Sequence, residues 1–462
     1  MTIKKGQILP LDIDDMALGG KGIARVEGMV VFVDQCVPRD RVLARITRKK
    51  KNYAEAAIVS IIESSPVRRE PPCPYAGFCG GCKWQFIDYE KQVEFKRRHV
   101  QEALTHIGLL DDVRVHPTLR SQNRLAYRNK MEFSFSDRRW LLPHELNDTS
   151  ADRDFALGLH VPGTFHKVLD IQACLLQPET GNRLLNDVND FVRASKLPVY
   201  GLKSHEGFWR FLMLRHSAHY DRWMVNIITA AEHRAEIASL ARMLAEKHPR
   251  LASVMHNITA KKAQIAVGDY ETCMFGDSII TDRIGPYDFE ISANSFFQTN
   301  TRGAEQLYTR VKDYAELTGK ETVLDLYCGT GTIAIFLSAH ARQVIGIEIV
   351  ESAVADAWRN CQINGISNCR FIQGDIKASL SLLTETPDVM IIDPPRAGMH
   401  KDVVKQVLDM SPSKIVYVSC NPATLARDVG LMKDRYAVTE VQPVDLFPQT
   451  FHIESVAKLK RI

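Results

Sequence analysis

Apolar residues fall into short runs separated by helical stretches over the last third of the chain. Continuous apolar runs that alternate with helices are typical of parallel strands joined by crossover helices, so residues 296–462 are expected to form an α/β domain. Ligands of such sheets bind beyond the carboxyl ends of the strands, which is where polar residues cluster here. The runs are TVLDLY, QVIGIE, CRFIQ, DVMIID and KIVYVS.

The rest of the chain has a different pattern. Residues 1–63 contain short strand-like segments joined by glycines, such as Met29 to Val33 and Val42 to Ile46, and predict a small β-barrel. The proline-rich stretch 64–72 reads as a linker. From Tyr127 onwards apolar and polar residues alternate, as in KMEFSFS, with one amphipathic helix near residues 233–246. Residues 64–295 are therefore expected to form a mixed, sheet-rich central domain.

Composition narrows the class of protein. The 462 residues are too many for one hydrophobic core, and 45% hydrophobic with 25% charged residues is typical of a folded globular protein. The net charge is only +4, so affinity for nucleic acid must come from local patches, for example the basic run between Arg39 and Lys51. No apolar stretch of 18 residues and no signal peptide is visible, which predicts a cytoplasmic protein without membrane contact.

The stretch Val323-Leu-Asp-Leu-Tyr-Cys-Gly-Thr-Gly-Thr332 is an apolar strand followed by a Gly-x-Gly turn. Glu348 ends the next strand, where a carboxylate can accept hydrogen bonds from both ribose hydroxyls. No third glycine follows, so a nucleoside without phosphates fits better than a dinucleotide. Asp375 and Asp393 follow the third and fourth strands, and Asp375 is placed to contact an adenine edge. The alternative is that each acid caps a helix.

Cys420 closes the fifth strand in Val418-Ser-Cys-Asn-Pro422, at the edge where a substrate should lie. Cysteine is more often a small buried apolar residue, but a thiolate at this edge suits one demanding reaction. Carbon 5 of a pyrimidine is a poor nucleophile until a thiolate adds to C6 and converts the ring to an enolate. Once C5 of the enolate has been alkylated, a base must remove the C5 proton so that the thiol can be eliminated, and Glu454 is the candidate. Glu454 could instead be a surface carboxylate beside the last strand.

With these residues the chain resembles the RNA uracil-5-methyltransferases of ribosomal and transfer RNA. The resemblance implies S-adenosylmethionine as cofactor and a Rossmann-like domain at residues 296–462. It further implies Cys420 as nucleophile, Glu454 as proton acceptor, and Phe296 stacking on a flipped base. Cofactor contacts would be Gln298, Tyr327, Glu348 and Asp393, whereas Thr332 stands where some relatives have Asn. The motifs that match are Phe296-Phe-Gln-Thr-Asn300, Asp325-Leu-Tyr-Cys-Gly-Thr-Gly331, Asp393-Pro-Pro-Arg-Ala-Gly398, Ser419-Cys-Asn-Pro422 and Phe447-Pro-Gln-Thr-x-His-x-Glu454.

Cys73, Cys79 and Cys82 form a C-x5-C-x2-C cluster rich in glycine, and Cys174 is the best candidate for a fourth thiolate, with Cys273 in reserve. The spacing leaves zinc and an iron-sulfur cluster both open. The resemblance favours a [4Fe-4S] cluster, because the iron-sulfur branch of the family carries this arrangement. That branch also has an N-terminal RNA-binding barrel of the TRAM type, OB-like in fold, which residues 1–63 resemble.

RNA is thus the expected partner, and no obligate protein partner is expected. The cluster and barrel together favour ribosomal RNA, specifically 23S, over transfer RNA. Radical S-adenosylmethionine enzymes are a rival, but their C-x3-C-x2-C triplet is missing. Amino-group methyltransferases are a second rival, but they use Asn-Pro-Pro-aromatic where this chain has Asp-Pro-Pro-Arg. A non-catalytic RNA-binding or redox-responsive protein on the same fold is the third.

Overall fold

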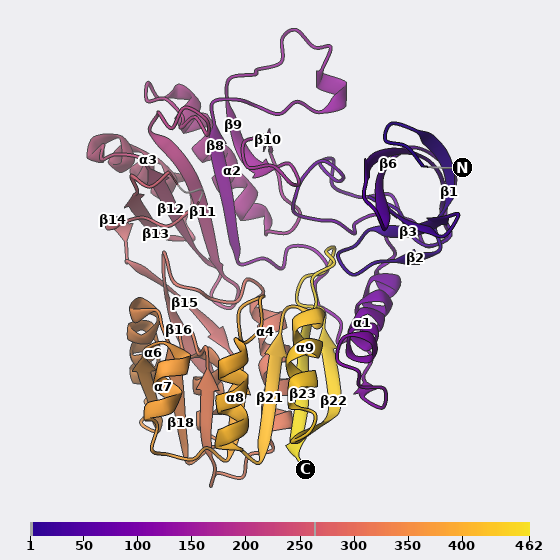
Figure 1. The fold of residues 1–462 in the computed structure, drawn as a ribbon. Coiled ribbons are helices and arrows are strands. Elements are labelled where there is room, and N and C mark those ends of the chain that lie inside the picture. The colour runs from indigo at the N-terminus through magenta and orange to yellow at the C-terminus, as the bar shows by residue number, and fades with distance from the viewer. Residues whose placement is uncertain (1–2, 263–264) are drawn as a thin grey trace.

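The computed structural model describes residues 3–262 and 265–462. Figure 1 shows an N-terminal barrel, a central sheet domain beside it, and a C-terminal α/β domain below both. Within the described residues, no helix has the length and apolar character needed to cross a membrane.

The N-terminal strands form one curved six-stranded sheet in the order β1-β5-β6-β4-β3-β2. Along β5, Val42, Ala44 and Ile46 are buried whereas Arg41 and Arg45 are exposed, so the alternation that predicts the barrel also turns its basic residues outward. The expected small β-barrel is confirmed. Its strands are β1 (Ile8–Asp12), β2 (Asp15–Met16), β3 (Gly22–Val26), β4 (Met29–Val33), β5 (Arg41–Lys49) and β6 (Tyr53–Glu63).

The central domain is a seven-stranded mixed sheet in the order β10-β9-β8-β11-β12-β13-β14. Helices α2 and α3 pack on one face of it, where Leu185 and Leu240 join the same buried cluster as Leu212 and Val225. The domain comprises β8 (Lys130–Ser136), the 3-10 helix η1 (Pro143–Glu145), β9 (Ala156–His160), β10 (Val168–Asp170), α2 (Glu179–Ala194), β11 (Trp209–Ser217), β12 (Arg222–Thr229), α3 (Arg234–Lys247), β13 (Leu251–Ile258) and β14 (Tyr270–Gly276).

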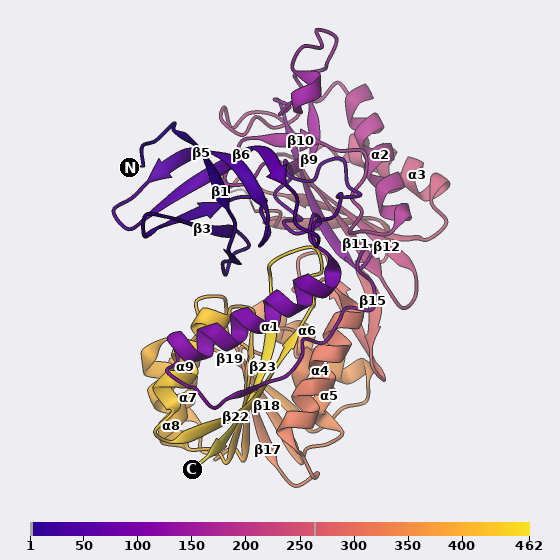
Figure 2. The ribbon, with the colours of Figure 1, turned by 90° about the vertical axis from the view of Figure 1, so that its right-hand side faces the viewer.

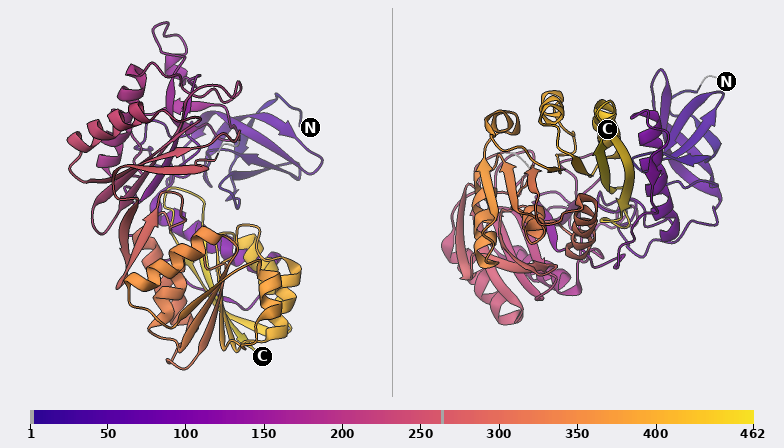
Figure 3. Two further views of the ribbon diagram at one scale, coloured as in Figure 1. Left: turned by 90° about the vertical axis from the view of Figure 1, so that its left-hand side faces the viewer. Right: turned by 90° about the horizontal axis from the view of Figure 1, so that it is seen from below.

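The C-terminal domain contains an eight-stranded sheet in the order β19-β18-β17-β20-β21-β23-β22-β7. The five strands expected from the apolar runs are parallel, and β23 then pairs antiparallel with β21. Helices cover both faces (Figure 3). The elements are α4 (Thr301–Ala315), β17 (Thr322–Leu326), α5 (Thr332–Ser338), β18 (Gln343–Glu348), α6 (Glu351–Ile363), β19 (Cys369–Gln373), α7 (Ile376–Leu382), β20 (Val389–Ile392), α8 (Lys401–Met410), β21 (Lys414–Ser419), α9 (Pro422–Met432), β22 (Tyr436–Val444) and β23 (Glu454–Arg461).

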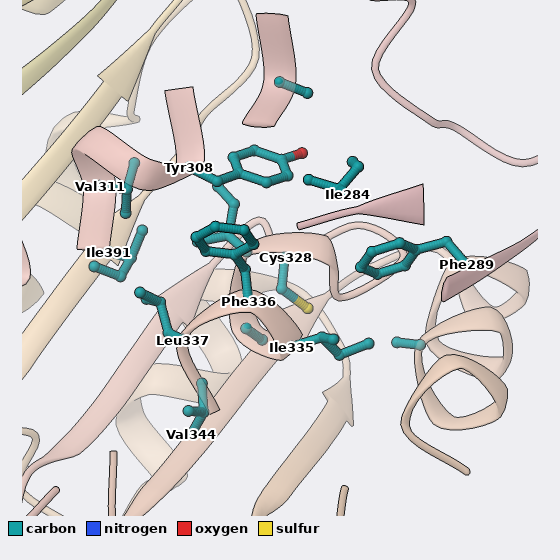
Figure 4. Close-up of a cluster of buried hydrophobic side chains, with 14 of the residues drawn as sticks. Ile284, Phe289, Tyr308, Val311, Cys328, Ile335, Phe336, Leu337, Val344 and Ile391 are labelled. Carbon is teal, nitrogen blue, oxygen red and sulfur yellow. The ribbon is translucent and has the colours of Figure 1, made fainter. Parts of the chain in front are cut away.

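A two-stranded hairpin, β15 (Ile279–Ile284) and β16 (Tyr287–Ser292), joins the central and C-terminal domains. Its apolar side chains enter the core of the C-terminal domain, and Figure 4 shows Ile284 and Phe289 beside Tyr308 and Phe336. Burial of these side chains fixes the hairpin to the α/β domain.

Two elements inside the expected central segment 64–295 belong elsewhere. Helix α1 (Tyr89–His106) lies along the C-terminal domain beside α9 (Figure 2), and Val100 and Leu104 join that domain's core. Strand β7 (Arg114–Val115) pairs with β22 at the edge of the eight-stranded sheet. The apolar pattern of a helix predicts that one face is buried, but it does not identify the partner, so sequence alone misplaces both elements.

Candidate active site

A cavity of about 610 Å³ lies at the carboxyl ends of the parallel strands, where the order of the sheet reverses beside β17. The structure brings seven of the eight residues expected in the reaction site to its wall. They are Phe296, Gln298, Tyr327, Glu348, Asp393, Cys420 and Glu454.

The Gly-rich turn between β17 and α5 forms one side of this cavity. Gly331 has φ +74°, and a Cβ there would lie 2.8 Å from the ring of Phe371, so the tight turn requires glycine. The Glu348 carboxylate accepts hydrogen bonds from the backbone N–H of Gly329 at 3.1 Å and of Val350 at 2.9 Å. These bonds fix the carboxylate at the mouth of the turn.

Asp325 lies in the Gly-rich motif, but no role was predicted for it from the sequence. Its side chain is buried, and neither carboxylate oxygen accepts a well-formed hydrogen bond among the residues that the structure describes. Burial, followed by the charge of Asp393, raises its pKa well above the ordinary value, while the Ala334 backbone N–H opposes the shift and the charge of Glu348 adds to it. An acid inside the otherwise apolar run TVLDLY is the signal that would have identified it, because an unpaired buried carboxylate is costly unless a ligand satisfies it.

Cys420 and Glu454 come from neighbouring strands at the other side of the cavity. Glu454 is 6% exposed and begins β23. Burial raises the pKa of Cys420 to about 11, with the charges of Glu454 and Asp393 adding to the effect and that of Arg396 opposing it. Burial also raises the pKa of Glu454 well above its usual range, again with Arg396 in opposition. Desolvation raises the pKa of Asp393 to about 7.

Arg396 lines the same cavity and is the cation beside both reactive groups. Sequence reasoning assigns it no role, although it follows Asp393-Pro-Pro directly. Its guanidinium stabilises the ionised forms of Cys420 and Glu454, and a thiolate and a carboxylate are the forms that a nucleophile and a base would require.

Phe296 and Thr332 have contrasting surroundings. Phe296 is 65% exposed in spite of lining the cavity, and its carbonyl accepts a hydrogen bond from the Thr330 hydroxyl at 3.3 Å. An exposed aromatic ring at the mouth of a cavity is suited to stack on a base. Thr332 also lines the cavity, and its hydroxyl lies within hydrogen-bond distance, 2.9 Å, of the Tyr308 hydroxyl.

The eighth residue, Asp375, lies outside the wall of the cavity. It is exposed at the start of α7, and its carboxylate accepts a hydrogen bond from the Ala378 backbone N–H at 3.1 Å. This is the helix-capping role given above as the alternative. Its expected contact with adenine stays a prediction.

A second cavity, of about 290 Å³, is lined by all four expected cysteines, Cys73, Cys79, Cys82 and Cys174. Cys273 lies elsewhere, exposed in β14. Burial raises the pKa of Cys79 to about 11 and of Cys82 to about 12. Thr299 lines both this cavity and the larger one, so the two cavities share part of a wall.

The four thiols could serve as ligands of two kinds of metal centre. Among the described residues, no group of three or more His, Cys, Asp or Glu side chains is arranged to hold a metal ion. A single zinc ion requires its thiolates about 2.3 Å from the metal, whereas an iron-sulfur cluster spreads four thiolates over a larger body. Four thiols around one cavity supply the number of ligands that either centre requires.

Two family models match parts of the chain. Residues 277–462 match the tRNA (uracil-5-)-methyltransferase family, and residues 3–59 match the TRAM domain. The first match includes the hairpin of β15 and β16, and thus begins before residue 296. It contains every residue of the larger cavity.

Proteins that are similar over nearly the whole chain point to the same family. An uncharacterised RNA methyltransferase of Chlorobaculum tepidum is 45% identical, over 99% of this chain and 97% of the relative. Another from Bacteroides thetaiotaomicron is 43% identical, over 96% and 100%. The crystal structure of the Pyrococcus abyssi tRNA (uracil-54, C5)-methyltransferase in complex with S-adenosyl-L-homocysteine superposes with a TM-score of 0.77. It is 28% identical, over 98% of this chain and 100% of that one.

Proposed function

This chain belongs to the RNA uracil-5-methyltransferase family, and from that premise we propose that it methylates C5 of a uridine in 23S ribosomal RNA through a covalent bond between Cys420 and C6. S-adenosylmethionine-dependent methylation of RNA is the activity of the family. The observation that supports the covalent mechanism is the placement of a thiol and a buried carboxylate on one cavity with the Gly-rich turn, whereas 23S ribosomal RNA is proposed from the family resemblance of the cysteine cluster and barrel.

The cavity fits S-adenosylmethionine on its own residues. The fixed carboxylate of Glu348 is placed to accept hydrogen bonds from the ribose hydroxyls, and Gln298, Tyr327 and Asp393 add polar groups to the wall. The buried carboxylate of Asp325 suits the ammonium group of the methionine portion, which would return it to the ionised form. When bound, the sulfonium supplies an electrophilic methyl group.

The base must leave its stack before C6 is reached, because attack occurs on the ring face. We place the extruded uracil against Phe296, whose exposed ring can replace a lost stacking partner. The Cys420 thiolate then adds to C6, and the electron pair of the C5–C6 double bond moves onto the ring as an enolate. The enolate carbon C5 takes the methyl group, and the sulfonium leaves as a neutral thioether.

Glu454 completes the reaction by accepting the proton from C5. The electrons of that C–H bond restore the C5–C6 double bond and expel the Cys420 thiolate. A carboxylate with a raised pKa is a stronger base than an exposed one, and burial gives Glu454 that property. The same burial favours its protonated form at rest, so the nearby cations Arg396 and Lys96 are needed to keep part of it ionised.

We propose a [4Fe-4S] cluster at Cys73, Cys79, Cys82 and Cys174. The shared cavity and the C-x5-C-x2-C spacing support it. A cluster bound there would supply cross-links between the 73–82 segment and the central sheet. No step of the methylation described above requires it to transfer electrons.

Transfer RNA is the second candidate substrate, because the matching family and the Pyrococcus abyssi enzyme are both named as methyltransferases of transfer RNA. Incubation of the protein with labelled S-adenosylmethionine and unmodified 23S ribosomal or transfer RNA, followed by nucleoside analysis, separates the two. We expect 5-methyluridine in ribosomal RNA and none with Cys420→Ala. Label confined to transfer RNA would select the second candidate, and label on an amino group would contradict both.

A further inference from the structure

The connection between β22 and β23, residues 445–453, delivers Glu454 to the cavity. Val444 pairs with Glu454 in the register of the two strands, so Asp445 lies one residue beyond the pair that contains the base. Phe447, within the connection, lines the cavity itself. The position of Glu454 therefore depends on how this connection is anchored.

Its anchors come from a part of the chain more than 300 residues earlier. The Gln449 carbonyl accepts hydrogen bonds from the backbone N–H groups of Lys83 at 3.0 Å and Trp84 at 2.9 Å. The Gln92 side chain accepts from the Gln449 N–H at 3.0 Å. The Tyr127 hydroxyl donates to the Pro448 carbonyl at 3.1 Å.

Lys96 of α1 is the charged member of this set. Its side chain is 0% exposed, and Nζ lies 2.5 Å from Oδ1 of Asp445, which is also 0% exposed. Nζ donates a second hydrogen bond to the Phe447 carbonyl at 3.1 Å. The other Asp445 oxygen, Oδ2, accepts from the Tyr89 hydroxyl at 2.8 Å. One ammonium thus holds the connection at two points.

A buried ion pair is not in itself a sign of function, and such pairs seldom stabilise a fold more than well-packed apolar residues would. This pair differs from an ordinary structural one in its location. It lies at the base of the segment that presents Glu454, and its cation acts on the Glu454 carboxylate.

We propose that Lys96 is a positioning residue for the proton-abstraction step, holding the 445–453 connection through Asp445 and Phe447 so that Glu454 faces the C5 proton. The inference rests on the proposed function, in which Glu454 is the base. Lys96 does not touch the reacting atoms in this account.

The charges around Glu454 and Lys96 also predict an effect on the ionisation of Glu454. Asp393, Arg396 and Lys96 act on Glu454, and Glu454 in turn acts on Cys420. Around Lys96, the other titratable groups are Asp445, His99 and His452. Lys96 lowers the pKa of Glu454, so its loss leaves less of the carboxylate ionised at a given pH.

The test measures two products, so that the addition of Cys420 to C6 can be distinguished from its later elimination. Lys96→Met is incubated with RNA and labelled S-adenosylmethionine, and the denaturant-stable protein–RNA adduct is quantified against released 5-methyluridine. We expect the ratio of adduct to product to rise roughly tenfold or more, because only the base-dependent step slows. The pH dependence of product release should move to higher pH.

Two further variants make the result interpretable. Lys91→Met makes the same change on the same helix, at a side chain that is 39% exposed, and should behave as wild type. Because Lys96→Met leaves Asp445 buried without its cation, the double variant Lys96→Met/Asp445→Asn removes both charges and carries the test if the single variant does not fold. It should also accumulate adduct.

An adduct-to-product ratio equal to that of wild type overturns the inference, whether activity is unchanged or both products fall together. Glu454→Gln, tested in parallel, reports on the proposed function separately. If Glu454→Gln accumulates adduct and Lys96→Met does not, the role of Lys96 is wrong and the base assignment stands. If Glu454→Gln accumulates none, the base assignment itself fails.

Discussion

Cys420 and Glu454 face one cavity from neighbouring antiparallel strands. Ser419 of β21 pairs with Ser455 of β23, so the residues that follow and precede this pair lie opposite each other at the end of the sheet. In a strand parallel to β21, the last residues would lie at this edge of the sheet. Because β23 runs in the opposite direction, its first residue lies there instead. The reversal lets a carboxylate near the C-terminus meet the thiol.

The first prediction concerns the thiol of the free protein. Burial and neighbouring carboxylates raise the pKa of Cys420 to about 11, so the thiol is protonated near neutral pH. Alkylation of Cys420 by iodoacetamide, followed by mass spectrometry of its peptide, should accelerate about tenfold per pH unit up to about pH 11. Arg396→Gln should slow it at each pH. If the rate reached a plateau by about pH 9, as for an ordinary thiol, the raised pKa of Cys420 would be contradicted.

Glu348 provides a test of the cofactor site. Its carboxylate is held by two backbone N–H groups, and Glu348→Gln removes the charge that strengthens hydrogen bonds from the ribose. We expect affinity for S-adenosylhomocysteine, measured by calorimetry, to fall about tenfold. Glu351→Gln, an exposed acid in the first turn of α6, is the matched control and should bind normally. Equal affinity in both variants would remove Glu348 from the site.

Asp375 is expected to act chiefly on stability. Because its carboxylate caps α7, Asp375→Ala should lower the free energy of unfolding by about 1 kcal/mol, and Asp375→Asn should be nearly neutral. Denaturant unfolding measures both. Identical stability of wild type and Asp375→Ala would argue against the cap. The affinity of Asp375→Ala for S-adenosylhomocysteine tests the predicted contact with adenine in the same sample.

The cavity lined by the four cysteines leads to a prediction about the iron and sulfide content of the purified protein. Protein purified without oxygen should contain about four iron atoms and about four sulfides per chain, and Cys82→Ser should lose them. Cys273→Ser changes an exposed cysteine outside the cavity and should keep them. Stoichiometric zinc in place of iron, or no metal in freshly purified protein, would contradict the cluster.

Much of the candidate site could be predicted from local sequence. Residues at the ends of apolar runs meet at one edge of a parallel sheet, which is why Glu348, Asp393 and Cys420 could be grouped before their positions were known. The Gly-rich turn was equally readable, because few residues other than glycine adopt φ +74°. These inferences depend on strand period and turn chemistry, which a single sequence contains.

The long-range contacts could not be predicted in this way. Lys96 and Asp445 are 349 residues apart, and neither belongs to a motif that announces a partner. A lysine in an amphipathic helix is ordinarily exposed, so its burial depends on α1 packing against the C-terminal domain. The wall shared by the two cavities at Thr299 likewise arises from the packing of separate domains.

The central claim is that Cys420 bonds to C6 and Glu454 removes the C5 proton. The most direct measurement is intact mass spectrometry of Glu454→Gln after incubation with RNA and S-adenosylmethionine. Without its base the reaction should stop after methyl transfer, which predicts a covalent protein–RNA species carrying one added methyl group. This species should be absent from the double variant Cys420→Ala/Glu454→Gln. Free 5-methyluridine formed by Glu454→Gln at the wild-type rate, or an adduct that survives loss of Cys420, would contradict the account.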